Sequence, residues 1–292
     1  MRSIRTLLHG LIDYAGLFPP AGLDLPTAAA NYASYRASDV YWALGRFVVP
    51  VARLGELEAS GAMPLQPGGA PWKITALAGS DLAGDLTEIA RFNRHQSGCA
   101  VADTIELKAG TADAITDALR TIEGQLHAFV EIPIEEDPAP LIDTLAKSDG
   151  RAKVRTGGVT PDRFPEPLHL LRFIRRCVDA NLPFKATAGL HHPLGGAYRL
   201  TYEAGSACSA MFGFLNVFLV AAFLQHGMAN GDALELLEES SPTGFHFDQE
   251  GVAWRSHRLD AVELRHGRRL ALAFGSCSFL EPIDDLRAMR LL

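Results

Sequence analysis

The chain has few cysteines, and no two of them are spaced like a metal-binding or redox pair. Cys99, Cys177, Cys208 and Cys277 are far apart among 292 residues, without a CxxC motif. This spacing favours neither a zinc site nor a disulfide framework, so a reducing cytoplasm is the expected compartment. Residues 210–225, the longest apolar stretch, fall short of the roughly 20 residues that a membrane span needs. We therefore expect a cytoplasmic protein without membrane contact.

An excess of positive charge is also missing. Lysine and arginine number 27 against 34 aspartates and glutamates, which gives a formal net charge of −7. Without a basic stripe to neutralise phosphates, nucleic acid is not an expected partner. Internal repeats and low-complexity segments are absent as well, and 48% of the residues are hydrophobic. The composition therefore predicts a folded chain with a large buried core.

Short apolar runs alternate with helical patterns along most of the chain, which indicates repeated βα units and a parallel sheet. Eight strands are predicted, at residues 11–17, 45–51, 72–77, 104–108, 128–133, 152–156, 183–188 and 211–218. Helices are expected at residues 28–36, 54–60, 82–96, 112–123, 139–147, 165–180, 218–226 and 232–239. The pattern predicts a (β/α)8 TIM barrel over residues 1–240.

The pattern changes after residue 240. Residues 245–255 and 259–273 alternate as β-structure does, and a short helix is expected at residues 283–289. We therefore predict that residues 241–292 form a β-rich C-terminal appendage packed on the barrel.

Parity along the predicted strands aims charged side chains into the barrel. Alternate residues of a barrel strand point inward, and the others face the apolar layer under the helices. In residues 104–108, Ile105 and Leu107 take the helix side, so Glu106 and Lys108 point inward.

The next three strands repeat this arrangement. Parity turns Glu131 inward from one strand, Lys153 and Arg155 from the following one, and Lys185 and Thr187 from the third. Burying charges is costly unless they are paired, and inward charges high in a barrel usually serve chemistry. Cations outnumber carboxylates here, which favours an anionic or strongly polarised substrate. The alternative is an ion-pair network that only fills the barrel.

Polar and glycine-rich segments follow two of these charged strands. Glycines there let backbone N–H groups approach a ligand, and neighbouring barrel loops often hold an anion. Asn216 is a polar residue within a very apolar run, and a ligand or Lys185 would satisfy it. The candidate binding residues in the two loops are Thr156, Gly157, Gly158, Gly189, His191 and His192.

Residues 153–157 (KVRTG) and 184–189 (FKATAG) resemble strands 6 and 7 of Schiff-base (class I) aldolases of the deoxyribose-phosphate aldolase type. The resemblance implies that Lys153 forms an imine with a carbonyl substrate. It also matches acidic positions of that family to Glu106, Glu131 and Asp13. Arg155 stands where the family has a small residue, and two histidines replace a phosphate-binding segment, so the implied substrate is not deoxyribose phosphate. Residues 12–20 are also similar to a bacterial protein family to which no activity is attached.

The first functional hypothesis is therefore an aldolase or related lyase that uses no cofactor. Lysine must be neutral to attack a carbonyl, and Lys185 or Arg155 is expected to favour the neutral amine of Lys153. Glu106 would move the proton as the carbinolamine forms and collapses.

Two other hypotheses stay open. One is a metal-dependent lyase or isomerase with Glu106, Glu131 and His191 as ligands. The other is a non-catalytic barrel that binds or senses an anionic metabolite. A homodimer is the expected assembly, and the role of Cys277 is left open.

Overall fold

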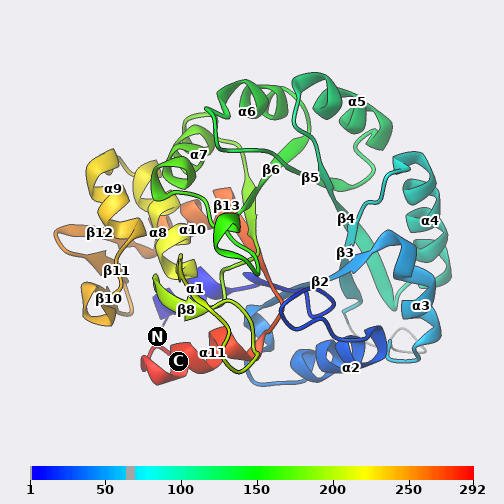
Figure 1. The fold of residues 1–292 in the computed structure, drawn as a ribbon, viewed down its shortest axis with the longest axis horizontal. Helices are drawn as coiled ribbons and strands as arrows, with labels where there is room; N and C mark the ends of the chain where they lie inside the picture. The colour runs from blue at the N-terminus through cyan, green and yellow to red at the C-terminus, as the bar shows by residue number, and fades with distance from the viewer. Residues whose placement is uncertain (1, 64–69) are drawn as a thin grey trace.

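The computed structural model describes residues 2–63 and 70–292 and contains a closed barrel of eight parallel strands. Figure 1 looks along the barrel, with α2 to α7 forming much of the outer ring. The strands follow one another around the barrel in the order β1-β2-β3-β4-β5-β6-β7-β13. Their bounds are β1 Ile12–Tyr14, β2 Leu44–Pro50, β3 Trp72–Leu77, β4 Ala100–Lys108, β5 His127–Glu131, β6 Gly150–Arg155, β7 Phe184–Thr187 and β13 Ala271–Ser276.

Helices cover the outside of this barrel and bury its apolar layer. Side chains such as Ile105, Val130, Val154 and Ala186 are fully buried between strands and helices. The helices are α1 Arg2–Leu8, α2 Leu25–Arg36, α3 Leu54–Ala59, α4 Leu82–His95, α5 Ala112–Ile122, α6 Ala139–Ala146, α7 Pro167–Asp179, α8 Phe214–Gln225, α9 Asn230–Leu237, α10 Ala261–Leu270 and α11 Leu280–Ala288. The predicted (β/α)8 barrel is confirmed, and no helix of the described residues is long and apolar enough to cross a bilayer.

Two small antiparallel sheets accompany the barrel. A hairpin of β8 Gly196–Arg199 and β9 Cys208–Met211 follows β7. A three-stranded sheet of β10 Phe245–Phe247, β11 Gly251–Trp254 and β12 His257–Asp260 accounts for the β-structure predicted near residue 250. Figure 1 shows this sheet beside α9, outside the ring of strands.

The eighth strand is not where the sequence predicted it. Residues 211–218 leave β9 at Met211 and enter α8 at Phe214, whereas β13 closes the barrel between β1 and β7. From Phe214 to Leu224 every residue of α8 is buried, so its apolar residues form no stripe. Periodicity alone cannot separate such a helix from a buried strand. The last barrel strand, β13, therefore lies within residues 241–292, which were predicted to form the appendage. The barrel does not end at residue 240.

The β-structure predicted over residues 259–273 is wrong in its middle, between β12 and β13. Residues 261–270 form α10, which begins with a capping box in which Asp260 accepts hydrogen bonds from the backbone of Val262 and Glu263. Gly267 lets α10 approach α8 closely, since a Cβ atom there would lie 2.4 Å from the Cβ atom of Ala222. These contacts pack α10 against α8, and β13 begins directly after α10.

Candidate active site

The carboxyl ends of all eight barrel strands meet at one end of the barrel, and charged side chains gather there. In the orientation of Figure 1, the space-filling view shows lysine or arginine side chains beside aspartate or glutamate side chains near the middle of the face. The structure brings Glu106, Glu131, Lys153 and Lys185 together in buried positions, with Asp13 from β1 as a fifth member.

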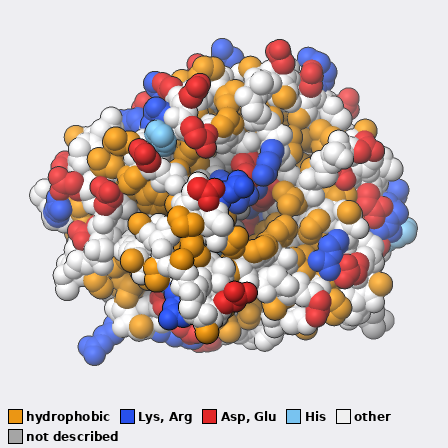
Figure 2. All heavy atoms as spheres, in the orientation of Figure 1, with side chains coloured by type: hydrophobic (Ala, Val, Ile, Leu, Met, Phe, Trp, Pro, Cys, Tyr) orange, Lys and Arg blue, Asp and Glu red, His pale blue; other side chains and the backbone are white. Residues whose placement is uncertain are grey.

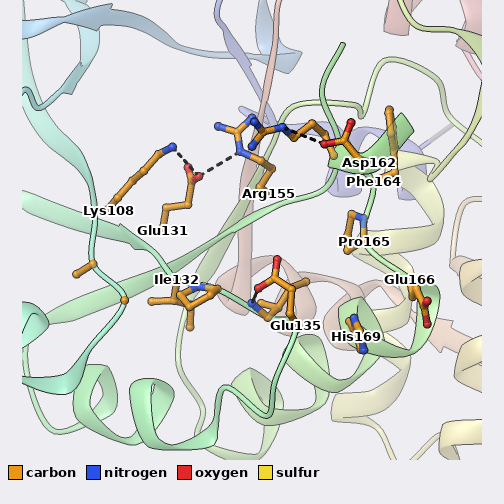
Figure 3. Close-up of a pocket in the computed structure, with 15 residues that line it drawn as sticks. Lys108, Glu131, Ile132, Glu135, Arg155, Asp162, Phe164, Pro165, Glu166 and His169 are labelled. Atoms are coloured by element: carbon orange, nitrogen blue, oxygen red, sulfur yellow. Dashed lines mark hydrogen bonds and ion pairs between the residues drawn. The ribbon is translucent and has the colours of Figure 1, made fainter. Parts of the chain in front are cut away.

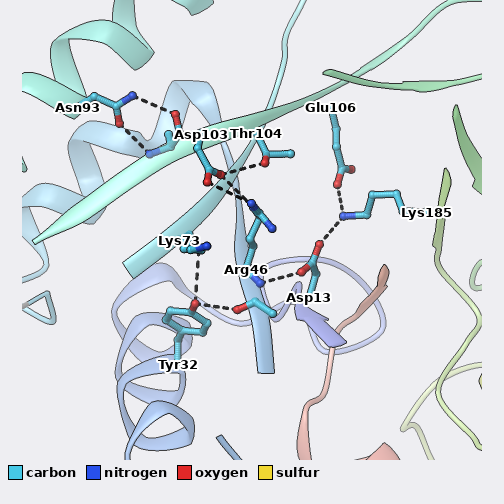
Figure 4. Close-up of polar contacts among 11 residues, drawn as sticks. Asp13, Tyr32, Arg46, Lys73, Asn93, Asp103, Thr104, Glu106 and Lys185 are labelled. Atoms are coloured by element: carbon cyan, nitrogen blue, oxygen red, sulfur yellow. Dashed lines mark hydrogen bonds and ion pairs between the residues drawn. The ribbon is translucent and has the colours of Figure 1, made fainter. Parts of the chain in front are cut away.

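Lys185 is held by two carboxylates (Figure 4). Its Nζ atom lies 2.5 Å from Asp13 Oδ2 and 2.5 Å from Glu106 Oε1. The other oxygen of Asp13 accepts a hydrogen bond of 2.7 Å from the backbone N–H of Arg46. Burial by itself would lower the pKa of Lys185, but the two carboxylates raise it above the usual value. Lys185 is therefore a fixed, protonated cation and a poor nucleophile.

Glu106 bridges the two lysines. Its Oε2 atom lies 2.7 Å from the Nζ atom of Lys153, while Oε1 contacts Lys185. Burial by itself would raise the pKa of Glu106, yet the lysines outweigh it and lower the pKa to about 2. Glu106 thus stays ionised and holds both ammonium groups in place.

Lys153 continues the row towards β5. Its Nζ atom lies 2.9 Å from Glu131 Oε2 as well as 2.7 Å from Glu106. The closest charged groups of Lys153 are therefore carboxylates, and not the cations expected from the sequence. Each of these carboxylates can take up the proton that Lys153 must lose to become a nucleophile.

Glu131 ends the buried row and opens onto a cavity (Figure 3). Its Oε1 atom lies 3.2 Å from Arg155 Nε and 3.4 Å from Lys108 Nζ. Burial would raise the pKa of Glu131, but Lys153 and Arg155 lower it below the usual range. Alternating charges thus run from Asp13 across the barrel to the partly exposed cations Arg155 and Lys108.

The cavity beyond Glu131 has a volume of about 660 Å³ and lies among the segments that follow β4, β5 and β6. Lys108, Glu131 and Arg155 contribute charge from the strand ends, and Phe164 and His169 belong to the opposite wall. Lys153 does not line the cavity. It lies one contact deeper, behind Glu131. A ligand in the cavity would meet Arg155 and Glu131 first and reach Lys153 by displacing their contact.

The glycines of the two predicted loops serve loop packing. A Cβ atom on Gly157 would lie 2.9 Å from the Cα atom of Gly189 and 2.5 Å from the Phe164 ring. Gly158 lies similarly close to the side chain of Arg163. Thr156 is buried and donates a hydrogen bond of 2.5 Å to the carbonyl of Ala188, a residue with a φ of 62°. These residues join the ends of β6 and β7, where Thr187 is the register partner of Arg155.

Two predicted binding residues lie elsewhere. His192 Nδ1 is 2.7 Å from Asp285 Oδ2 of α11, and its ring stacks on Tyr198. Asn216 donates to the carbonyls of Leu236 and Glu239, with its Oδ1 atom accepting from the backbone N–H of Gly195. With its amide satisfied in this way, Asn216 ties α8 to its neighbours and does not contact Lys185.

His191, a predicted binding residue, belongs to a second polar group at the carboxyl ends of β7 and β13, which the sequence analysis did not assemble. His191 Nδ1 lies 3.5 Å from Ser276 Oγ, 3.9 Å from Cys277 Sγ and 3.6 Å from Glu281 Oε2. The Tyr202 hydroxyl donates to Glu281 at 2.9 Å and lies 3.5 Å from Cys277 Sγ. Burial lowers the pKa of His191 to about 4 and raises that of Cys277, so both are neutral near pH 7. Once β13 is recognised as a barrel strand, Ser276 and Cys277 fall at its end, which is the signal that would have found them.

An ion pair between Arg46 and Asp103 was also missed in the sequence analysis. Arg46 Nε lies 3.0 Å from Asp103 Oδ1 (Figure 4).

The alternative metal ligands are not assembled, because the described part of the chain contains no group of three or more His, Cys, Asp or Glu side chains placed to share an ion. His191 lies with Cys277, whereas Glu106 and Glu131 contact lysines.

Comparison with protein-family models and with curated proteins finds no match.

Proposed function

We propose that the barrel is a lyase that forms a Schiff base between Lys153 and the carbonyl group of a small anionic substrate. The observation that carries this proposal is the unequal setting of the two lysines. Asp13 and Glu106 hold Lys185 in its charged form, while Lys153 contacts Glu131, which borders the cavity. Of the two buried lysines, Lys153 is thus the one whose amine lies closer to the cavity, behind Glu131.

The proposed step begins when the substrate's anionic group binds Arg155 and Lys108. Both cations contact Glu131, so an anion that competes for them weakens their contacts with Glu131. Lys153 transfers one proton to a carboxylate, and its Nζ atom attacks the carbonyl carbon. A C–N bond forms as the π bond of the carbonyl group breaks, and the oxygen takes up a second proton from the attacking nitrogen. The hydroxyl of the resulting carbinolamine leaves as water, with the proton returned by the carboxylate.

Glu131 is the better candidate for this proton transfer. Glu106 is shared between two lysines and its pKa is lowered to about 2, which makes it a weak base. Glu131 borders the cavity and loses contacts to Arg155 and Lys108 when an anion binds them. We assign Glu131 the proton transfer, and Glu106 and Lys185 the positioning of Lys153.

Borohydride trapping tests the proposal directly. The purified chain is incubated with pyruvate or glycolaldehyde, reduced, digested and mapped by mass spectrometry. We expect the reduced adduct on Lys153 and its loss in Lys153→Ala. Lys147→Ala, at an exposed residue after α6, is the matched control and keeps the adduct. An adduct on a lysine other than Lys153 contradicts the assignment. Saturable binding of these compounds without any adduct also contradicts it, and favours a binding protein.

A further inference from the structure

A second cavity, of about 820 Å³, lies at the other end of the barrel, where strands β1 and β13 begin. Helices α1 and α10 each lead into one of these strands, and the two helices are in contact. The side chains around the cavity are mostly basic, and they come from these helices and from the turn between β10 and β11. They are Arg2, Arg5, Thr6, His9, Gln249, Arg265 and Arg268. We call this set the arginine pocket.

The apolar spacing of the two helices fixes this arrangement. In α1, Ile4, Leu7 and Leu8 are buried, which turns Arg2 and Arg5 to the opposite side. In α10, Leu264, Gly267 and Leu270 are buried, which leaves Arg265 exposed. Ser3 Oγ donates a hydrogen bond of 2.5 Å to the carbonyl of Asp248, and this bond holds α1 beside the turn that carries Gln249. The basic side chains thus converge because the core holds both helices.

The pocket is positively charged, whereas the chain as a whole carries a net negative charge. None of the described residues that line it is acidic, although acidic residues outnumber lysine and arginine 34 to 27. The active-site cavity, in contrast, is lined by four acidic residues. Two carboxylates flank Gln249 in the sequence, Asp248 and Glu250, and Arg258 pairs with them at 2.8 Å and 3.7 Å. Among the described residues, the four pocket arginines have no ion pair with a carboxylate.

Arg268 is the pocket arginine whose polar contacts are described most fully. Its guanidinium donates to the carbonyls of His9, Ala271 and Leu272, while its buried Nε atom has no hydrogen-bond partner among the described residues. Burial lowers the pKa of Arg268 to about 10. A half-buried cation whose hydrogen-bond acceptors are all carbonyls is stabilised by an anion bound near it.

We propose that the arginine pocket binds a small anion that carries at least two phosphate groups. Arginine forks match phosphate oxygens with paired charge-assisted hydrogen bonds, and four arginines line the pocket. The guanidinium of Arg5 lies 4.6 Å from the ring centre of Trp42, which holds it in position before a ligand arrives. Gln249 adds a neutral amide donor.

This site is distinct from the proposed Schiff-base site. The two cavities share no lining residue, and they lie at opposite ends of the strands. Ligands of barrel enzymes bind at the carboxyl ends of the strands, so a ligand at the amino ends acts as a regulator or a stabiliser and not as the substrate.

Calorimetric titration with inorganic pyrophosphate, at low salt and again at 0.15 M salt, tests the proposal. We expect one saturable site per chain, with affinity that falls as salt rises. Arg265→Ala is expected to weaken binding about tenfold or more, as the loss of a charge-assisted hydrogen bond does. Arg269→Ala removes the same charge from another exposed position of α10, outside the pocket, and its affinity should match that of the unmodified chain.

Two further experiments test whether pyrophosphate binds at the active-site cavity instead, and whether the pocket binds a membrane surface. Arg155→Gln removes a cation of the active-site cavity and should leave pyrophosphate binding unchanged; a loss there would place the anion at the wrong end of the barrel. Vesicles with and without phosphatidylserine test for a membrane surface. Binding to the anionic vesicles without binding of pyrophosphate would overturn the small-ligand assignment, as would the absence of saturable binding or equal weakening in Arg265→Ala and Arg269→Ala.

Discussion

Lys153 and Lys185 are register partners on adjacent strands, and the single carboxylate of Glu106 contacts both of their ammonium groups. Two buried cations side by side would repel each other strongly without it. The remaining contacts differ, since Lys185 also has Asp13 and Lys153 has Glu131. Because of this difference, Lys185 is a fixed charge, whereas Lys153 lies directly behind Glu131, which lines the cavity.

Replacing Glu106 by Gln is therefore expected to destabilise the fold. Removing one partner of a buried ion pair usually costs about 3–5 kcal/mol, because the other charge is left uncompensated. Urea unfolding monitored by circular dichroism measures the loss. Glu56→Gln is the control, because Glu56 pairs with Arg53 at the surface and its loss should produce no measurable change. Equal midpoints for the two variants would contradict a stabilising role for Glu106.

Stability should also fall in acid because of the same group. The pKa of Glu106 is lowered to about 2 in the folded chain, and an unfolded glutamate titrates near ~4.3. The contribution of Glu106 is therefore complete above about pH 4.5, and it is lost as the pH falls towards 2. The loss is on the order of 3 kcal/mol. Lys185, whose pKa is raised, keeps its contribution at neutral pH and loses it only in strong alkali. Unfolding midpoints from pH 2 to 8 should vary less in Glu106→Gln than in the unmodified chain, and parallel curves would show that Glu106 is not responsible.

Much of this row follows from local alternation in the sequence. Glu106, Glu131, Lys153 and Lys185 stand between apolar residues, so parity alone turns them inward on β4 to β7. The role of Lys185 does not follow, because Asp13 reaches it from β1 only once the barrel has closed through β13.

The closing strand could not be read from local pattern. Helix α8 is apolar on all sides, and the periodicity that distinguishes helix from strand is therefore lost. With β13 misplaced, Ser276 and Cys277 were not expected at the end of a barrel strand, and the contacts of His191 remained hidden. Asn216 shows the same limit, since its partners are carbonyls that lie 20 and 23 residues away in the chain.

Arg155 should discriminate between anionic and neutral substrates. It lies at the cavity with part of its side chain exposed, and it pairs with Glu131 through a single 3.2 Å contact. In Arg155→Gln, borohydride trapping of pyruvate should fall about tenfold or more, as expected for a lost hydrogen bond to a charged group. Trapping of dihydroxyacetone, which has no charge, should change little. An equal fall for both compounds would mean that Arg155 positions the lysine and does not bind the anion.

Gly157 is expected to tolerate no side chain. A Cβ atom there would lie 2.9 Å from the backbone of Gly189 and closer still to the Phe164 ring, so the loops after β6 and β7 would have to separate. Overpacking of this kind costs about 1–3 kcal/mol, and Gly157→Ala should lower the thermal midpoint. Gly55→Ala, on an exposed face of α3 with no atom within 4 Å, should leave the midpoint equal or higher. If both variants melt together, the contact between the two loops is looser than described.

Cys277 is expected to react slowly with alkylating reagents at neutral pH. Burial raises the pKa of its thiol, although the hydrogen bond with Tyr202 partly offsets this, and only the thiolate is the nucleophile. Cys208 is exposed on β9 and should be labelled first by iodoacetamide. Peptide mass spectrometry over time should show the labelling of Cys277 lagging at pH 7 and accelerating as the pH rises, because the thiolate fraction grows towards the raised pKa. His191, at 3.9 Å, is neutral at this pH and does not stabilise the thiolate as a cation would. His191→Gln should therefore not slow the labelling of Cys277. Labelling of Cys277 as fast as Cys208 at pH 7 would show instead that the thiol is ionised, and that His191 is its charged partner.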